Sequence, residues 1–378
     1  MRVALVHDFL VQMGGAEKVL EVLHGMFPSA PVYTSVYEPK AMPDFYAKWD
    51  IRTSFLQNMW MKRQTHRLAL MLYPMAFESF DFSEFDLVIS SSSCFAKGVI
   101  TGPETHHLCY TYTPMRYAWA TGNYAQRERI GKLSRLALAP ITHYLRLWDA
   151  VAASRVDTYV TISAAVQRRV EKYYRRDSEI IAPPVETSRF FVSQRVEEYY
   201  IVVSRMIPYK RLDLAVDAFS RLRIPLKVVG TGRQLADLQS RAGDCVQFLG
   251  HVPDADLPTL LSKARGYVMP GEEDFGLAPV EANASGRPVI AFAAGGALDT
   301  QIHGRTGILF KEQTVDSLCD AVCQAQETDF DPEYIHEHAL QFDTSVFKTR
   351  VHDAVVATMT RSDPSGGTRA AVHALQTH

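Results

Sequence analysis

Short apolar runs alternate with amphipathic segments along most of the chain, and this alternation is the clearest structural signal in the sequence. Residues 3–6 are apolar at every position, which is typical of a strand covered on both faces of a sheet. A glycine pair, Gly14-Gly15, comes after this run. The apolar spacing that follows predicts a helix from Ala16 to Phe27. Strands that alternate with helices predict βαβ units and parallel sheets.

The alternation forms two series, which predicts two doubly wound α/β domains in a chain of 378 residues. Further strands of the first series are predicted at 31–37, 86–90, 107–112, 157–162 and 180–185, with Ser163 as the N-cap of a helix. Strands of the second series are predicted at 199–203, 226–229, 246–249, 267–269, 288–292 and 307–310. The helices between them are predicted at 211–222, 233–241, 256–264 and 279–285.

These series give the predicted domain organisation. We expect a first domain at 1–187, a linker at 188–198 and a second domain at 199–345. Residues 346–378 are predicted to form a helix that returns to the first domain, followed by a flexible tail.

Composition narrows the range of functions. The net charge is −2, so the chain has no overall positive field that would favour nucleic acid. Its five cysteines complete no zinc pattern, and no apolar run is long enough to span a membrane. The first residues lack the pattern of a signal peptide, so a cytoplasmic protein with reduced thiols is expected.

In open parallel sheets, ligands bind beyond the carboxyl ends of the strands, so the residues after each run are the first candidates for chemistry. Arg205 and Lys210 follow the first strand of the second series. A guanidinium and an ammonium beside a helix N-terminus suit a diphosphate. Two solvated surface cations explain the same spacing, and the sequence leaves both interpretations open.

The stretch Pro270–Phe292 contains the second candidate group. Pro279 fits the first turn of a helix, and Gly286 fits the position just after its end. Glu273 then lies in the loop and Glu281 in the first helical turn, where carboxylates can accept hydrogen bonds from sugar and ribose hydroxyls. A dipole partner and a solvated loop residue are the alternatives.

Other glycines and carboxylates give weaker signals. Gly230 and Gly232 lack the third glycine of a dinucleotide fingerprint, so an ordinary turn is an equal alternative to a nucleotide contact. Gly14-Gly15 can present backbone amides to a phosphate or sugar, or form a plain turn. Two Asp-x-Asp triplets, at 254–256 and 329–331, resemble a metal motif, but we expect the first to cap a helix.

Together these motifs resemble the retaining family 4 glycosyltransferases of the GT-B fold. Arg205 and Lys210, the E-x7-E pair Glu273/Glu281, "GRPVIA", "AAGGALDT" and "TGILF" carry the resemblance in the second half. In the first half, "VHDFLVQMGGAEKVLEVL", "VISSSSCFAKGV" and "YTPMRYAW" resemble mannosyltransferases that build bacterial polysaccharides and O-antigens. The resemblance runs from residue 1 to about residue 355 and implies two Rossmann-like domains facing each other across a donor/acceptor cleft.

The resemblance also implies roles. Arg205 and Lys210 would hold the diphosphate of a nucleotide-sugar donor, most simply GDP-mannose, and Glu281 would bind its ribose. The donor sugar would meet Glu273 and the amides of Phe275, Gly276 and Leu277. Gly14 and Gly15 would close over the donor. The family needs no metal and no other cofactor.

The acceptor side departs from the family pattern. Relatives often carry a histidine where this chain has Tyr112, and a phenol is a poor base at neutral pH. His7, Asp8, Arg116 and Tyr117 are further acceptor-side candidates. The implied acceptor is a saccharide or a lipid-diphosphate-linked saccharide.

Rival functions remain open. These are a UDP- or dTDP-sugar transferase, a nucleotide-sugar epimerase or phosphorylase-like enzyme, a hydrolase with paired carboxylates, and an inactive sugar-nucleotide-binding subunit of an assembly complex. Basic residues lie among apolar ones in the first domain, at 59–77, 127–155 and 167–176. These clusters predict peripheral, salt-sensitive association with the cytoplasmic face of the inner membrane. Ordinary amphipathic helices are the alternative.

Overall fold

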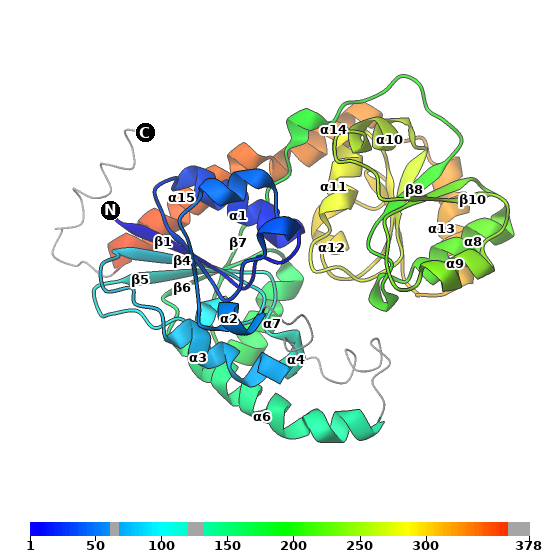
Figure 1. Cartoon of the computed structure of the whole chain (residues 1–378). Coiled ribbons are helices and arrows are strands. Elements are labelled where there is room, and N and C mark those ends of the chain that lie inside the picture. Colours follow the sequence, from blue (N-terminus) through cyan, green and yellow to red (C-terminus); the bar gives the residue numbers. More distant parts are fainter. Residues whose placement is uncertain (61–67, 120–131, 362–378) are drawn as a thin grey trace. The chain divides into compact units, whose positions relative to one another are not determined.

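The structure is a computed structural model, and it describes residues 1–60, 68–119 and 132–361. The chain divides into two compact units (Figure 1). Unit 1 consists of Met1–Ala182 together with Phe347–His378, and unit 2 consists of Pro183–Val346. The segment 188–198, predicted as a linker, is part of unit 2, where the Arg287 guanidinium donates to the Ser193 carbonyl at 2.6 Å.

Within the described residues, unit 1 is built on a seven-stranded parallel sheet with the order β3-β2-β1-β4-β5-β6-β7. The strands are β1 (Val3–His7), β2 (Val32–Thr34), β3 (Ile51–Thr53), β4 (Leu87–Ser92), β5 (His106–Thr111), β6 (Thr158–Thr161) and β7 (Glu179–Ile180). The helices are α1 (Gly15–Met26), α2 (Leu56–Trp60), α3 (Tyr73–Glu78), α4 (Arg116–Trp119), α6 (Lys132–Ser154) and α7 (Ala164–Tyr174). The 3-10 turns are η1 (Pro39–Ala41), η2 (Asp44–Lys48), η3 (Leu68–Met71) and η4 (Ala96–Gly98).

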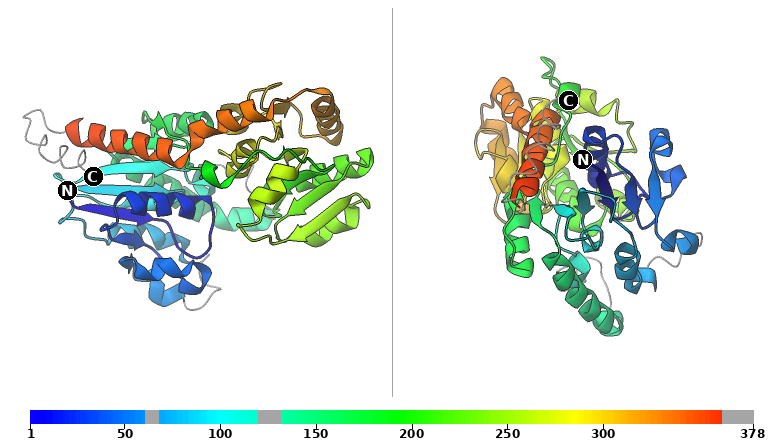
Figure 2. Two further views of the ribbon diagram at one scale, coloured as in Figure 1. Left: turned by 90° about the horizontal axis from the view of Figure 1, so that it is seen from above. Right: turned by 90° about the vertical axis from the view of Figure 1, so that its left-hand side faces the viewer.

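The last helix, α15 (Thr344–Arg361), is part of unit 1 from Phe347 onward. Figure 2 shows α15, in orange to red, lying along the strands of unit 1. The Phe347 ring packs edge-on against Tyr110 of β5, and the Thr358 hydroxyl donates to the Thr158 hydroxyl at 2.9 Å. These contacts join the end of the described chain to the middle of the sheet.

Unit 2 contains, within the same described residues, a six-stranded parallel sheet with the order β10-β9-β8-β11-β12-β13. The strands are β8 (Tyr200–Val203), β9 (Leu226–Val229), β10 (Val246–Gly250), β11 (Gly266–Met269), β12 (Val289–Phe292) and β13 (Gly307–Phe310). The helices are α8 (Leu212–Leu222), α9 (Leu235–Arg241), α10 (Leu257–Lys263), α11 (Leu277–Ala284), α12 (Ala297–Thr300), α13 (Val315–Glu327) and α14 (Pro332–Ala339). The 3-10 turns are η5 (Thr187–Arg189), η6 (Pro208–Lys210) and η7 (Leu340–Phe342).

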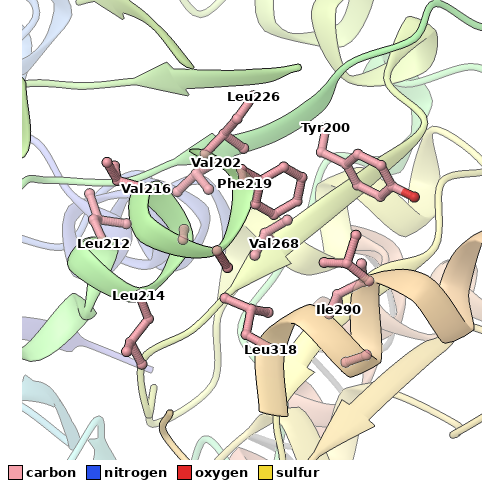
Figure 3. Packing of buried hydrophobic residues seen from close by; sticks show 14 of the residues in the cluster. Tyr200, Val202, Leu212, Leu214, Val216, Phe219, Leu226, Val268, Ile290 and Leu318 are labelled. Atoms are coloured by element: carbon pink, nitrogen blue, oxygen red, sulfur yellow. The ribbon is translucent and has the colours of Figure 1, made fainter. Parts of the chain in front are cut away.

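The core of unit 2 lies between its sheet and the helices α8 and α13. Figure 3 shows Phe219 of α8 and Leu318 of α13 directed at Val268 in the middle strand β11. All three side chains are fully buried. This packing holds β8 and β11 side by side, and the residues that follow these two strands form the candidate site.

The predicted fold class is confirmed: both units are doubly wound α/β sheets with parallel strands. Most predicted strands and helices are present within a few residues of their predicted bounds. Ser163 caps α7 as predicted, because its side chain accepts from the Val166 amide. One strand was missed: β3 is a half-exposed edge strand of three residues and has no apolar run.

Candidate functional site

The strand order of each sheet defines where a ligand can be bound. In each unit the order reverses between two central strands, β1 and β4 in unit 1, and β8 and β11 in unit 2. The crevice beyond the carboxyl ends of such strands is the usual ligand site of open α/β folds. Arg205 comes directly after β8 and Glu273 after β11, so the topology alone brings their loops together.

Two glycines from the neighbouring strand support the loop that carries Arg205. The Ser204 amide of this loop donates to the carbonyl of Val229 at the end of β9, and the Met206 amide donates to the Thr231 carbonyl just after it. A Cβ on Gly230 would lie 2.1 Å from the Ser204 carbonyl oxygen, and one on Gly232 would lie 2.4 Å from the Met206 oxygen. These glycines therefore permit close approach of two protein loops. The Arg205 side chain is exposed.

Lys210 lies in the turn η6 and not in the helix that follows it. Arg211 adopts a left-handed conformation with φ of 53° and separates the turn from α8. The Lys210 ammonium forms an ion pair with the Glu273 carboxylate, and the two side chains are 19% and 17% exposed. Two of the predicted site residues therefore meet, from loops 63 positions apart in the chain.

The Glu273 loop is held by the glycine pair after β12. The Gly296 amide donates to the Glu273 carbonyl at 2.8 Å, and Glu273 forms an isolated parallel bridge with Gly295. A Cβ on Gly295 would lie 2.0 Å from the Glu273 carbonyl oxygen, and one on Gly296 would lie 2.3 Å from the Cα of Phe275. No other residue type fits this contact without displacing the loop.

The start of α11 lies directly after this loop. Gly276 is the N-cap with φ of 93°, so the helix begins at Leu277, two residues earlier than predicted. The first-turn amides of an α-helix lack partners within the helix and can donate to a ligand. The predicted end is confirmed, because Gly286 follows the C-cap Ser285 with φ of 70°.

The earlier helix start corrects the position of Glu281. It was predicted in the first turn, but α11 has no acidic residue there, and Glu281 is the fifth helical residue. Glu281 and Glu273 nevertheless lie near the same phenol. Burial first, and then these two carboxylates, hold the pKa of Tyr267 well above its usual range. Tyr267 donates its hydroxyl to the Val203 carbonyl at 2.9 Å, at the end of β8.

In unit 1, His7 ends β1 and Asp8 follows it. The Asp8 carboxylate accepts hydrogen bonds from the hydroxyl of Ser93 and from the amides of Ser93, Cys94, Phe95 and Ala96, at 2.6 to 3.0 Å. Five donors occupy the acceptor capacity of this carboxylate. Asp8 therefore binds the loop that follows β4, which is an internal structural role. Gly14, with extended backbone, is the N-cap of α1, and Gly15 is its first residue.

Tyr112, at the position where the resembled family often has histidine, is hydrogen-bonded within unit 1. Its hydroxyl contacts the Ser91 hydroxyl at 2.8 Å and donates to the Ala16 carbonyl at 3.1 Å. Burial raises the pKa of the Tyr112 phenol, with smaller contributions from the neighbouring acids. The phenol is therefore neutral at physiological pH. Arg116 begins α4, whereas the Tyr117 side chain lies outside the part that the structure describes.

A buried ion pair holds α4 in place, and the sequence did not reveal it. Lys97 and Asp149 are 2% and 0% exposed and pair directly. Asp149 also accepts from the Trp119 indole of α4 at 2.7 Å and from the Tyr174 hydroxyl at 2.8 Å. The isolated lysine inside the apolar run "CFAKGV" was the available signal, because a buried lysine needs a partner.

The structure assigns a capping role to one of the two Asp-x-Asp triplets. Asp256 is the N-cap residue of α10, but its side chain makes no cap hydrogen bond, so the predicted capping role is wrong for that residue. Asp331 caps α14 by accepting from the amides of Glu333 and Tyr334. This second triplet therefore has a structural explanation.

Comparison with known proteins identifies a family for part of unit 2. Residues 197–328 match the family model for glycosyl transferases group 1. These residues belong to that family. The matched segment includes β8 to β13 and all the candidate residues of unit 2.

The group 1 domain also has named relatives. The chain is 31% identical over 241 residues to a GDP-mannose-dependent alpha-(1-6)-phosphatidylinositol monomannoside mannosyltransferase of Mycobacterium tuberculosis. That match covers 53% of this chain and 62% of the relative, less than two thirds of its length. An O-antigen chain mannosyltransferase, RfbU of Salmonella typhimurium, is 29% identical, with 39% of this chain and 45% of the relative covered.

Solved structures support the fold over nearly the whole chain. The Anabaena protein Alr3699/HepE in complex with UDP superposes with a TM-score of 0.69 at 16% identity, covering 94% of this chain and 100% of that one. Sucrose-phosphate synthase of Thermosynechococcus elongatus gives a TM-score of 0.74 at 16% identity, covering 96% and 100%. The group 1 domain and its partner unit therefore have the GT-B glycosyltransferase fold.

Proposed function

We propose that this protein is a retaining hexosyltransferase that transfers mannose from GDP-mannose to a saccharide or a lipid-diphosphate-linked saccharide in bacterial polysaccharide assembly. The observation that carries the proposal is the ion pair of Lys210 with Glu273 at the point where the strand order of unit 2 reverses, with Arg205 in the same loop as Lys210. An anion-binding cation and a hydroxyl-binding carboxylate in direct contact suit the junction of a diphosphate and a sugar.

Each residue then has a defined task. Arg205 and Lys210 bind the diphosphate and neutralise the charge that develops when the bond between the anomeric carbon and the phosphate oxygen breaks. Glu273 and the amides of Phe275, Gly276 and Leu277 hold the sugar hydroxyls. Glu281 accepts from the ribose hydroxyls. The new bond forms to the acceptor oxygen on the same face of the sugar, as retention requires, and the acceptor proton passes to the departing diphosphate.

Donor binding is expected to break the ion pair between Lys210 and Glu273. A diphosphate competes with Glu273 for the Lys210 ammonium, and the carboxylate released from the pair becomes available for sugar hydroxyls. Because two protein cations neutralise the diphosphate, transfer needs no metal or other cofactor. Activity is therefore expected to persist in excess chelator, whereas complete loss that added metal reverses would contradict the proposal.

Turnover with a panel of sugar nucleotides tests this function. Release of free nucleoside diphosphate from GDP-, UDP- and dTDP-sugars is measured with and without saccharide acceptors. The name of the Mycobacterium tuberculosis relative specifies GDP-mannose, and this favours the same donor here. Preference for a UDP- or dTDP-sugar would replace the donor assignment, and binding without turnover would favour an inactive sugar-nucleotide-binding subunit.

Substitutions test the assignment of the cations. Arg205→Ala or Lys210→Ala is expected to lower turnover by roughly a hundredfold, because an electrostatic contact to developing charge supplies a few kcal/mol. Arg241→Ala is the matched control, since that cation lies in α9 of the same unit and pairs with Asp217. Wild-type turnover of the Arg205 and Lys210 variants would contradict their roles.

We further propose that unit 1 associates peripherally with the cytoplasmic face of the inner membrane. None of the helices in the described ranges is both long and apolar enough to cross a bilayer. The exposed residues of α6 between positions 139 and 154 include no Asp, Glu, Lys or Arg, whereas Arg146 in this range is half-buried and donates to the Ala118 carbonyl. Among them, Tyr144, Leu147 and Val151 are 37%, 57% and 61% exposed.

This largely apolar face, which also includes His143, supports insertion into a lipid surface. Exposed cations on the neighbouring α7 (Arg168 and Lys172) and at its C-cap (Arg175) favour anionic lipid. The predicted cations Lys62, Arg63 and Arg67 lie outside the described residues. Two of the relatives act, by their names, on a phosphatidylinositol mannoside and an O-antigen chain.

Co-sedimentation with phosphatidylglycerol-containing and pure phosphatidylcholine vesicles tests the membrane proposal. Binding to the anionic vesicles is expected to weaken at high salt and in the double variant Leu147→Glu/Val151→Glu. Val196→Glu is the control, because Val196 is 47% exposed in unit 2. No binding at low salt, or equal binding to neutral vesicles, would rule out this mechanism.

A further inference from the structure

Buried polar side chains of unit 1 connect the end of β1 to the start of α1 through a chain of polar contacts. His7 is 2% exposed, and its Nδ1 lies 3.0 Å from the Ser91 hydroxyl of β4, the residue directly opposite it in the sheet. Ser91 contacts the Tyr112 hydroxyl at 2.8 Å, and Tyr112 donates to the Ala16 carbonyl at 3.1 Å. This first branch ends on the second residue of α1.

The second set of contacts involves the other nitrogen of the His7 imidazole. His7 Nε2 lies 3.6 Å from a carboxylate oxygen of Glu17, a side chain that is only 5% exposed. The other oxygen of Glu17 lies 3.0 Å from the position that a Cβ on Gly14 would occupy. Glu17 therefore folds back over the glycine turn, and both branches from His7 end within four residues of one another.

The direction of the hydrogen bonds follows from the donors available. The Tyr112 phenol carries one proton and uses it toward Ala16, since a carbonyl can only accept. The phenol oxygen then accepts from Ser91, and the Ser91 oxygen accepts from His7. His7 must therefore carry a proton on Nδ1. Its Nε2 lies 3.6 Å from the Glu17 carboxylate, beyond hydrogen-bond distance, and attracts that carboxylate only when Nε2 is protonated as well.

We propose that His7, Ser91, Tyr112 and Glu17 are positioning residues that together fix the Gly14-Gly15 turn. Tyr112 acts on this turn through the Ala16 carbonyl and does not contact a substrate. His7 is likewise an internal support and not an acceptor-binding group. This inference rests on the proposed function in one respect: the turn is taken to close over the donor.

The turn itself is suited to such control. Gly14 and Gly15 have no side chains that could pack against the rest of unit 1, and Gly15 is exposed. The position of the turn is therefore set by the residues that follow it, Ala16 and Glu17, which are the two ends of the connection. Loss of either branch leaves the first turn of α1 less restrained, and its amide hydrogens then exchange faster.

Amide hydrogen exchange tests the positioning role without requiring turnover. Tyr112→Phe and Ser91→Ala are each expected to speed exchange in residues 15–20 by roughly threefold to tenfold, the usual effect of one lost hydrogen bond. Tyr110→Phe is the matched control. It removes another buried tyrosine hydroxyl of the same strand region, one that donates to the Ile181 carbonyl at 2.9 Å and not to α1.

Kinetics test the link to the donor. Tyr112→Phe is expected to raise the donor KM by a similar factor and to change kcat by less, and adding Ser91→Ala is expected to have little further effect. Ring ¹⁵N spectra of the wild-type protein should show a protonated Nδ1 on His7. In Ser91→Ala this Nδ1 proton should exchange faster with solvent.

The outcomes separate this inference from the proposed function. Unchanged exchange at the start of α1 in both variants would overturn the positioning role, whatever the activity. Faster exchange with an unchanged donor KM and a lowered kcat would also overturn it, because Tyr112 would then act on the reacting groups. Absence of any transferase activity in the wild-type protein would contradict the proposed function, while the exchange result would still decide the positioning role.

Discussion

Gly295 offers a direct way to displace the Glu273 loop without altering any candidate side chain. A Cβ added at this position would lie 2.0 Å from the Glu273 carbonyl oxygen. Contact between a methyl group and an oxygen needs more than 3 Å, so Gly295→Ala must move the loop by about 1 Å. A misplacement of about 1 Å in a substrate-binding loop can cost roughly a hundredfold in rate.

Gly304 separates this displacement from backbone strain. Gly295 and Gly304 both have positive φ, 61° and 77°, so alanine costs about 1–2 kcal/mol at either position. A Cβ on Gly304, however, meets nothing within 4 Å. Both alanine variants therefore share the cost of backbone strain, whereas Gly295→Ala alone must also displace the loop and should lose roughly a hundredfold in kcat/KM.

The assay combines denaturant unfolding with nucleoside diphosphate release at a temperature where both variants are folded. Binding of the bare nucleoside diphosphate is measured as well. It should be little affected in Gly295→Ala, because Arg205, Lys210 and Glu281 do not belong to the displaced loop. Equal losses of activity in the Gly295 and Gly304 variants would refute the reasoning, since strain alone would then explain both.

Other residues give three further predictions. Asp149→Asn leaves the buried Lys97 ammonium without its carboxylate partner and should destabilise unit 1 by about 3–5 kcal/mol. Much of this loss should be recovered in the double variant with Lys97→Met. Urea unfolding followed by tryptophan fluorescence measures the change, since all four tryptophans lie in residues 1–182. Glu281→Ala should weaken binding of the bare nucleoside diphosphate, whereas Glu273→Ala should impair only the sugar-bearing donor; identical calorimetric losses in the two variants would contradict separate roles. Burial opposes ionisation of Asp343, but hydrogen bonds from neighbouring hydroxyls and amides outweigh it and lower the pKa to about 2. This lowered pKa stabilises the fold above the unfolded value of about 4, and the stabilisation is lost as pH falls from about 4 to about 2; Asp343→Asn should therefore flatten the acid limb of a stability curve.

Hydrophobic periodicity was sufficient to predict the architecture, because parallel strands covered on both faces are apolar throughout. The predicted strand at 226–229 coincides with β9, and the one at 307–310 coincides with β13. The edge strand β3 was missed because an edge position does not require a fully apolar run. The start of α11 was misplaced because Pro279 was taken for the first helical residue, whereas it is the third.

Side-chain partners were less accessible to sequence reasoning. Lys210 and Glu273 were predicted to lie in one site, because both follow central strands of the same sheet. Their direct ion pair depends on the turn η6, which periodicity does not detect. Lys97 and Asp149 are 52 residues apart, and nothing in either local pattern names the other as a partner. Pairing over such distances is fixed by tertiary packing.

Glycines that follow strands predict a close contact with the backbone but do not identify what makes that contact. A glycine after a strand indicates that something approaches the backbone closely, and for Gly230 and Gly232 the sequence left a nucleotide and an ordinary turn open. In the structure both glycines face the carbonyls of the Arg205 loop, and Gly295 likewise faces the Glu273 carbonyl. The close approach is therefore protein against protein. Its consequence for function is nevertheless direct, because each contact fixes the position of a loop that carries a candidate binding residue.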